Sequence, residues 1–469
     1  METAPVHQPQ GKHWKFAGLL QADRWITPAY VETDEKGRIN RISQVARPEI
    51  TYEELPGYVL PGLPNAHSHA FQYAMAGLSE RHAPGAEADD FWSWRQAMYR
   101  LALHVDPEQM YAIARMLYME MLSHGYTSVA EFHYLHHDQD GQPYAQLAQM
   151  GESLVAAAEE VGLRITLIPI FYQKGGFGQK PSPGQRRFIS QDLEAYLRLV
   201  ESSQEVCRRY ELAQLGYGGH SLRAVEPKIL PEFLSHIPTD YPFHLHISEQ
   251  KKEIQGSMAY LGRRPVEWLL DCCEIGENVH LVHATHLTDQ ETRDLAQSKA
   301  RVVLCPTTEG NLGDGRFPLQ KFQAQGGKWS IGTDSHIGLN PFEELRLLDY
   351  AQRLHSHQRN IYRDEGEANS GQYALRQMVT HGREAMGPSQ AEFFPVGAPF
   401  DAVVINALHP LIQTTSQDHL LNTIVYACDR QMVYGTLTQG IWRIKAGQHP
   451  RKTAVHEDFV YHLNRLKNR

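Results

Sequence analysis

Residues 58–71 read YVLPGLPNAHSHAF, a mainly apolar run that ends in two histidines, His67 and His69, separated by one residue. A short apolar run with Gly and Pro beside it favours a buried β-strand. From about residue 58 to about residue 397, similar short runs alternate with longer stretches of helical spacing. This alternation is typical of βα units.

Eight candidate strands follow one another along this region. They are residues 58–67, 128–134, 165–172, 215–221, 243–248, 279–284, 301–307 and 328–335. The stretch between the first two has recognisable helix ends, since Asp106 and Pro107 open it and Gly125 closes it. Eight such units predict an α/β fold with a (β/α)8 TIM-type barrel over residues 58–397. A doubly wound open sheet would normally carry a Gly-rich phosphate loop after its first strand, where this chain has NAHSHAF.

Both ends of the chain differ from this pattern. Residues 14–56 and 398–469 contain runs typical of strands and turns, such as DAVVINA, TIVYACD and GIWRIKAG. Neither end alone has enough strands to cover a core. We therefore expect residues 1–57 and 398–469 to join into one small β-sandwich-like domain beside the barrel.

Composition excludes several classes of protein. The 469 residues are 42% hydrophobic and 21% charged, which is ordinary for a globular chain and unlike a disordered one. A net charge of −9 without a dense basic run argues against a nucleic-acid partner. The five cysteines form no CxxC pair, and we find no apolar leader and no stretch of membrane-spanning length. We expect a cytoplasmic protein without a membrane partner.

The 26 histidines invite a search for metal or acid–base chemistry. Active sites of (β/α)8 barrels lie at the carboxyl ends of the strands. His67 and His69 end the first strand, and side chains two apart in a strand point to the same side, so both can reach one metal ion. Alone, they could equally be two ordinary polar residues at a strand end. His355 and His357 lie in a predicted helix, where side chains two apart diverge, and we expect them on the surface.

Polar residues end three further strands. HLHISEQ supplies His244, His246 and Glu249, VHATH supplies His283, and GTDS supplies Asp334. Three histidines and an aspartate give the nitrogen and oxygen ligands that zinc takes, with room left for water. We favour His246 over His244 as the ligand because it lies nearer the strand end, although strand parity allows either.

These motifs together resemble the deaminase branch of the amidohydrolase superfamily. PGLPNAHSHAF matches its first-strand HxH, HLHISE its fifth-strand HxxE, VHATH its sixth-strand histidine and GTDS its eighth-strand aspartate. The resemblance implies one zinc ion bound by His67, His69, His246 and Asp334. Binuclear members generally use a carboxylated Lys or a Glu at the end of strand four, and GYGGHSLRAV offers neither, which favours one divalent metal ion.

The same resemblance implies a role for each remaining polar group. Asp334 would accept a proton from a metal-activated water, and His283 would hydrogen-bond to that water. Glu249 would transfer a proton to the nitrogen that departs. An exposed carboxylate at a helix start is the ordinary alternative for Glu249.

Five further residues surround these motifs: Gln72, Arg95, Tyr134, His220 and Arg223. Two arginines near a hydrolytic metal suggest a small-molecule substrate that is a dicarboxylate, because guanidinium groups bind carboxylates in bidentate fashion. We expect Trp92 and Trp94 to pack the pocket wall. The run 175–188, rich in Gly and basic residues, is either a mobile lid or an ordinary surface loop.

Segments HAFQ, FWSWR, EFHY, GGHSLRAV and HISEQKKE resemble the formiminoglutamate deiminases within that branch. That resemblance implies hydrolysis of N-formimino-L-glutamate to N-formyl-L-glutamate and ammonia, a step of histidine degradation, by a homodimer. Arg95 and Arg223 would bind the glutamate carboxylates with help from Tyr134 and His220, and Gln72 would face the formimino end. The alternatives are a deaminase of guanine or a related heterocycle, and a binding protein that holds zinc only for structure.

Overall fold

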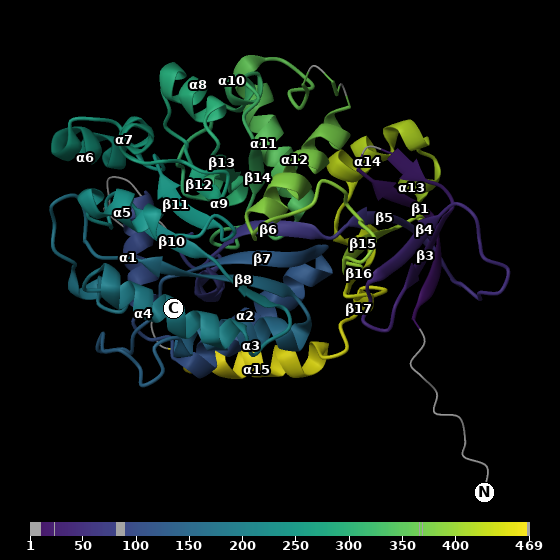
Figure 1. Ribbon diagram of the computed structural model, residues 1–469, viewed down its shortest axis with the longest axis horizontal. Coiled ribbons are helices and arrows are strands. Elements are labelled where there is room, and N and C mark those ends of the chain that lie inside the picture. The colour runs from purple at the N-terminus through teal and green to yellow at the C-terminus, as the bar shows by residue number, and fades with distance from the viewer. Residues whose placement is uncertain (1–10, 23, 81–89, 365, 368, 467–469) are drawn as a thin grey trace, which may run out of the picture.

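The computed structural model describes residues 11–22, 24–80, 90–364, 366–367 and 369–466. It consists of a helix-covered barrel and a separate β-sheet that lies beside it (Figure 1). In the figure, the separate sheet combines purple strands from the start of the chain with yellow strands from its end. This arrangement confirms the predicted α/β fold with a barrel and an additional β domain built from both chain ends.

Eight parallel strands form the barrel, each hydrogen-bonded to the next in chain order. They are β6 (Leu63–Ser68), β7 (Tyr126–His133), β8 (Arg164–Phe171), β10 (Tyr217–Ser221), β11 (Phe243–Ile247), β12 (Val279–His283), β13 (Arg301–Leu304) and β14 (Trp329–Ile331). Short β9 (Ala213–Leu215) pairs with β8 outside this order. Each of the eight predicted runs overlaps one of the eight barrel strands. All residues of β6, β11 and β12 are buried, as expected for parallel strands that are covered on both faces.

Backbone contacts close the barrel between its last strand and its first. The amide of Asp334 donates to the carbonyl of His67 at 3.0 Å, and the amide of His69 donates to the carbonyl of Asp334 at 3.1 Å. A Cβ on Gly332 would lie 2.6 Å from the Cβ of His67, so only glycine allows this close approach. The closure therefore places three predicted metal ligands side by side.

Helices cover the outside of the barrel. The α-helices are α1 (Phe91–Ala102), α2 (Pro107–Ser123), α3 (Gln149–Val161), α4 (Leu193–Cys207), α5 (Leu230–Ser235), α6 (Lys251–Leu261), α7 (Pro265–Cys272), α8 (Asp289–Gln297), α9 (Pro306–Asn311), α10 (Leu319–Gln323), α11 (Pro341–Ser356) and α12 (Ser370–Glu384). Short 3-10 helices are η1 (Ala70–Met75), η2 (Pro183–Gln185) and η3 (Pro227–Ile229). As predicted, α2 begins after Asp106, whose side chain accepts the amide of Gln109 at 2.8 Å. His355 and His357, at the end of α11, are exposed as expected.

The small domain is one mixed sheet of eight strands. They are β1 (His13–Gln21), β2 (Arg24–Ile26), β3 (Ala29–Thr33), β4 (Ile39–Ser43), β5 (Glu53–Pro61), β15 (Ala402–Asn406), β16 (Val433–Thr438) and β17 (Ile441–Lys445). The antiparallel pair β5 and β15 joins the two chain ends, with Val59 opposite Val404. Trp14, Phe16 and Phe400 form the aromatic centre of its core.

Two local features differ from the sequence-based expectations. The run 58–67 divides at Gly62, so residues up to Pro61 belong to the small sheet and β6 begins at Leu63. TIVYACD was predicted as strand-like, and this is wrong, because it lies mostly in helix α14 (Leu420–Ala427). Buried residues 420, 421, 424 and 425 have helical spacing, and this packing against α11 and α12 outweighs the β-branched composition.

The end of the chain contributes further helical segments, namely α13 (Pro410–Gln413), η4 (Gln417–His419), η5 (Arg430–Met432) and α15 (Lys452–Arg465). Helix α15 packs against α2, on the barrel (Figure 1). Of the helices in the described residues, none is both long enough and apolar enough to span a membrane.

Candidate metal centre and active site

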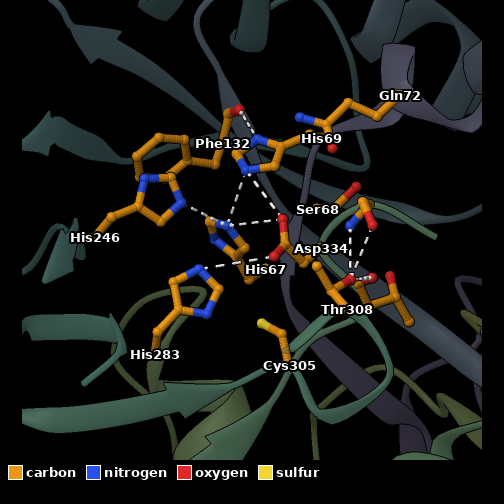
Figure 2. Close-up of polar contacts among 12 residues, drawn as sticks. His67, Ser68, His69, Gln72, Phe132, His246, His283, Cys305, Thr308 and Asp334 are labelled. Atoms are coloured by element: carbon orange, nitrogen blue, oxygen red, sulfur yellow. Dashed lines mark hydrogen bonds and ion pairs between the residues drawn. The ribbon is translucent and has the colours of Figure 1, made fainter. Parts of the chain in front are cut away.

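Three histidine side chains converge at the carboxyl end of the barrel. Nε2 of His67 lies 3.1 Å from Nε2 of His69 and 3.0 Å from Nε2 of His246 (Figure 2). An Asp334 carboxylate oxygen lies 3.2 Å from Nε2 of His69 and 3.7 Å from Nε2 of His67. None of these four residues is more than 6% exposed. The structure thus brings together the four predicted metal ligands, from strands one, five and eight.

Hydrogen bonds on the outer side of two rings orient this group. Nδ1 of His69 lies 2.9 Å from the carbonyl oxygen of Phe132, and Nδ1 of His246 lies 3.0 Å from the carbonyl oxygen of His220. A carbonyl only accepts, so both Nδ1 atoms carry the proton and both Nε2 lone pairs point inward. Burial, with the neighbouring histidines, holds the pKa of His67 and of His246 well below the ordinary value. Neutral rings whose lone pairs face one another at this distance suit a divalent cation between them.

The backbone is strained at three of the strand ends that carry polar groups. Ser248, His283 and Asp334 have φ values of 53°, 72° and 50°, in the left-handed region that non-glycine residues rarely adopt. Each follows or ends a barrel strand, and each redirects the chain just where a predicted functional side chain is needed. These turns aim Glu249, His283 and Asp334 at the same point.

His283 lies against the open side of the histidine cluster. Its Nε2 is 3.7 Å from Oδ2 of Asp334 and 4.0 Å from Oε1 of Glu249. Burial alone would lower the pKa of His283, but the hydrogen bond with Glu309 and the nearby carboxylates raise it to about 10. His244 instead faces away from the cluster's centre, with its Nε2 2.8 Å from the carbonyl oxygen of Ala385. The geometry therefore favours His246 over His244 as the ligand.

Glu249 belongs to a buried group of charges. Its Oε2 accepts a hydrogen bond from Arg223 at 3.1 Å, and Nε of Arg223 lies 3.8 Å from a Glu253 oxygen. The Glu253 carboxylate also accepts the backbone amides of Ser248 at 3.2 Å and Glu249 at 3.1 Å. Glu253 thus fixes the turn that presents Glu249.

One pocket joins the cluster to all five predicted substrate-binding residues. It is lined by His69, Gln72, Phe91, Trp94, Arg95, Met98, Tyr99, Tyr134, Tyr172, His220, Arg223, His246, Glu249, His283, Leu312 and Asp334. Gln72 donates to the hydroxyl of Tyr134 at 2.8 Å, and its own amide oxygen is buried without a partner. The walls are mainly aromatic, and the two arginines bring positive charge into the pocket.

The two arginines have different surroundings. Arg223 is 8% exposed and ion-paired, as described above. Arg95, on α1, lies with its guanidinium 4.2 Å from the ring centre of Trp92 and 5.5 Å from that of Tyr99. Nε of Arg95 is buried and has no hydrogen-bond partner among the described residues. The aromatic rings stabilise the positive charge of Arg95, and this charge is available to an anion. Trp94 lines the pocket, whereas Trp92 supports Arg95.

Sequence reasoning missed several residues of this region. Glu253 lies within the quoted segment HISEQKKE, and Glu309 follows strand seven by one helical turn. The position of each acid shortly after a barrel strand could therefore have indicated a place near the site. Buried Glu131, whose pKa is raised to about 7 by burial, accepts the amide of Ala70 at 2.6 Å and supports the turn after His69. Tyr99 and Tyr172 had no local motif.

The end of the loop 175–188 packs against the pocket wall. Gln185 donates to the hydroxyl of Tyr172 at 2.7 Å, and Phe188 is buried with its ring 5.1 Å from that of Tyr134. This part of the loop therefore supports residues that line the pocket.

The chain is similar to several known proteins. The model of the amidohydrolase family matches residues 58–442. Formimidoylglutamate deiminase of Pseudomonas aeruginosa is 43% identical over 418 residues, which cover 88% of this chain and 90% of that protein. An amidohydrolase structure from Brucella melitensis is 39% identical with a TM-score of 0.90, covering 97% of this chain and 99% of that one. A Xanthomonas campestris adenosine deaminase with bound zinc shares the fold at 19% identity and a TM-score of 0.79, covering 98% of this chain and 100% of that one.

The matched family region spans the barrel and most of the strands that follow it. This confirms the resemblance found in the sequence motifs, and the chain belongs to the amidohydrolase family.

Proposed function

We propose that this protein is a metal-dependent deiminase that hydrolyses N-formimino-L-glutamate to N-formyl-L-glutamate and ammonia. The observation that carries the proposal is a single pocket with a three-histidine, one-aspartate centre and two arginines, Arg95 and Arg223. The high identity to the Pseudomonas aeruginosa formimidoylglutamate deiminase supports this choice of substrate.

His67, His69, His246 and Asp334 would hold one zinc ion. Their inward Nε2 lone pairs and the carboxylate oxygen are the donor types that zinc takes in catalytic sites. A zinc ion bound there supplies Lewis acidity that makes a water molecule nucleophilic near neutral pH. Structural relatives of this protein contain bound zinc, and this supports the choice of zinc among the divalent metals.

The reaction adds water to the formimino carbon and breaks its bond to the terminal nitrogen. Asp334, the carboxylate beside the histidines, takes the proton that the water loses. His283, whose Nε2 faces the same space, hydrogen-bonds to the oxygen in the transition state. Both protons of the water reach the terminal nitrogen: Asp334 returns the one it took, and Glu249 passes on the second as the oxygen becomes the formyl carbonyl. That nitrogen then leaves as ammonia. Protonation of the other nitrogen would instead release glutamate.

The arginines would select the substrate. Each guanidinium binds one carboxylate of the glutamate part through charge-assisted hydrogen bonds. Tyr134 and His220 line the same wall and assist, and the unpartnered amide oxygen of Gln72 accepts from the formimino N–H groups. Guanine, the alternative substrate, carries no carboxylate that could pair with Arg95 or Arg223.

Three finer features stay predictions: one metal ion per chain, a cytoplasmic location with a place in histidine degradation, and a homodimer.

The test is to incubate the zinc-loaded protein with N-formimino-L-glutamate, N-formimino-L-aspartate and guanine, and to measure ammonia release and the organic product. We expect turnover of N-formimino-L-glutamate to N-formyl-L-glutamate, weaker turnover of the shorter dicarboxylate and none of guanine. Protein treated with a chelator is the control for metal dependence. Preferred turnover of guanine, or release of glutamate in place of ammonia, would contradict the proposal.

A further inference from the structure

The two ring nitrogens of His283 face different partners. Nε2 points toward Asp334, at 3.7 Å from Oδ2 (Figure 2), and so toward the reacting space. It also lies 4.0 Å from Oε1 of Glu249. Nδ1 points the other way and lies 3.2 Å from Oε1 of Glu309. None of the roles proposed above involves Glu309, although it is only 5% exposed and carries a carboxylate deep in the protein.

Glu309 is itself held in place. It lies in helix α9, directly after strand β13, and its backbone amide donates to the carbonyl of Cys305 at 2.9 Å. The backbone amide of Cys305 in turn donates to Oε1 of Glu309 at 2.9 Å. The oxygen that faces His283 is therefore fixed by the start of the helix, and a fixed acceptor defines the orientation of the ring that bonds to it.

We propose that Glu309 is a positioning residue that sets the orientation of the His283 ring. By accepting the Nδ1 proton, Glu309 keeps Nε2 directed at the oxygen that changes charge during the reaction. Without this acceptor the ring can rotate, and Nε2 is then no longer held toward the oxygen in the transition state. The inference deepens the proposed function and rests on it for the role of His283.

A second metal ion is the competing interpretation. His283, Cys305 and Glu309 each offer a ligand atom, and these atoms lie within 4.8 Å of one another. The Glu309 oxygen, however, already accepts an N–H group from Cys305 and faces a second on His283. That hydrogen-bond pattern satisfies the carboxylate oxygen without a cation, so we assign the group to positioning.

The experiment compares Glu309→Gln and Glu309→Asp with the wild-type enzyme loaded with zinc. We expect Glu309→Gln to lower kcat for N-formimino-L-glutamate by about 10- to 100-fold, with KM unchanged, and Glu309→Asp to recover part of the loss. Metal analysis should give one ion per chain in all three proteins. Proton NMR should show a far-downfield imidazole N–H resonance that is lost in Glu309→Gln and in His283→Asn.

Glu344→Gln is a matched control. Glu344 is equally buried and accepts the amide of Thr307, at the start of the same helix, at 2.9 Å, but it has no contact with His283. This variant should keep both kcat and the downfield resonance, which separates positioning from a general loss of packing around α9.

Several results would overturn the inference. An unchanged kcat in Glu309→Gln would do so, as would two ions in the wild type of which one is lost in both Glu309→Gln and Cys305→Ala. If the wild type does not hydrolyse N-formimino-L-glutamate, the proposed function fails, and the NMR comparison still decides whether Glu309 fixes His283. A resonance that survives in Glu309→Gln would then refute the positioning role.

Discussion

Replacing each pocket arginine by methionine should separate substrate binding from folding stability. Arg223 is 8% exposed and lies between two buried carboxylates, 3.1 Å from Glu249 and 3.8 Å from Glu253. Arg223→Met leaves both acids without their cation, and breaking such a buried pair costs about 3–5 kcal/mol of folding stability. The Arg95 guanidinium lies over the rings of Trp92 and Tyr99, and loss of these contacts in Arg95→Met should cost less than about 1 kcal/mol.

Both changes should damage turnover of the dicarboxylate. Each removes charge-assisted hydrogen bonds to one carboxylate, worth about 1.5–3 kcal/mol, so kcat/KM should fall by about 10- to 100-fold or more in each variant. Stability is compared by unfolding in guanidinium chloride with metal-loaded proteins, and activity by ammonia release. Equal destabilisation by the two variants, or wild-type kcat/KM in Arg95→Met, would refute this division of roles.

Three further predictions concern the proton shuttle, the barrel closure and pH. Glu249→Gln should lower kcat by about 10²- to 10⁴-fold while the zinc content measured by elemental analysis stays unchanged, because Glu249 lies outside the ligand cluster; loss of zinc would show that it is a ligand. Gly332→Ala places a Cβ 2.6 Å from the Cβ of His67 and should cost about 1–3 kcal/mol and weaken zinc binding in a chelator competition. Its control, Gly310→Ala, meets only Leu347 at 3.7 Å, and equal effects of the two would argue against a steric cause. The pKa of Glu384 is lowered from 4.5 to about 2 by hydrogen bonds from His381 and Arg301, which outweigh its burial. Because this folded-state pKa is depressed, the stabilisation should be complete above about pH 4.5 and lost as pH falls toward 2, so unfolding of Glu384→Gln should depend less on pH in that window than unfolding of the wild type.

Much of the site could be predicted because barrel geometry converts sequence position into spatial position. His67, His246, His283 and Asp334 each end, or closely follow, a short apolar run, and parallel strands in a barrel present those ends at one face. The two histidine pairs with one residue between them also lie where we predicted. His67 and His69 lie together at the centre of the cluster, and His355 and His357 are exposed.

Other features could not be predicted because they depend on tertiary contacts. By sequence, Glu253 and Glu309 are ordinary acidic residues near the start of a helix. Only the fold shows that Glu253 accepts the amides of Ser248 and Glu249, and that Glu309 faces Nδ1 of His283. The helix α14 and the break at Gly62 have the same origin, since packing on α11 and α12 and pairing with β15 decide their structure.

The most direct test of the account is a crystal structure of the zinc-loaded protein with the product N-formyl-L-glutamate. We expect one ion, located by anomalous scattering, bound by His67, His69, His246 and Asp334, with the formyl group beside it and the two carboxylates on Arg95 and Arg223. An ion bound elsewhere, or a product whose carboxylates contact neither arginine, would contradict the proposed reaction.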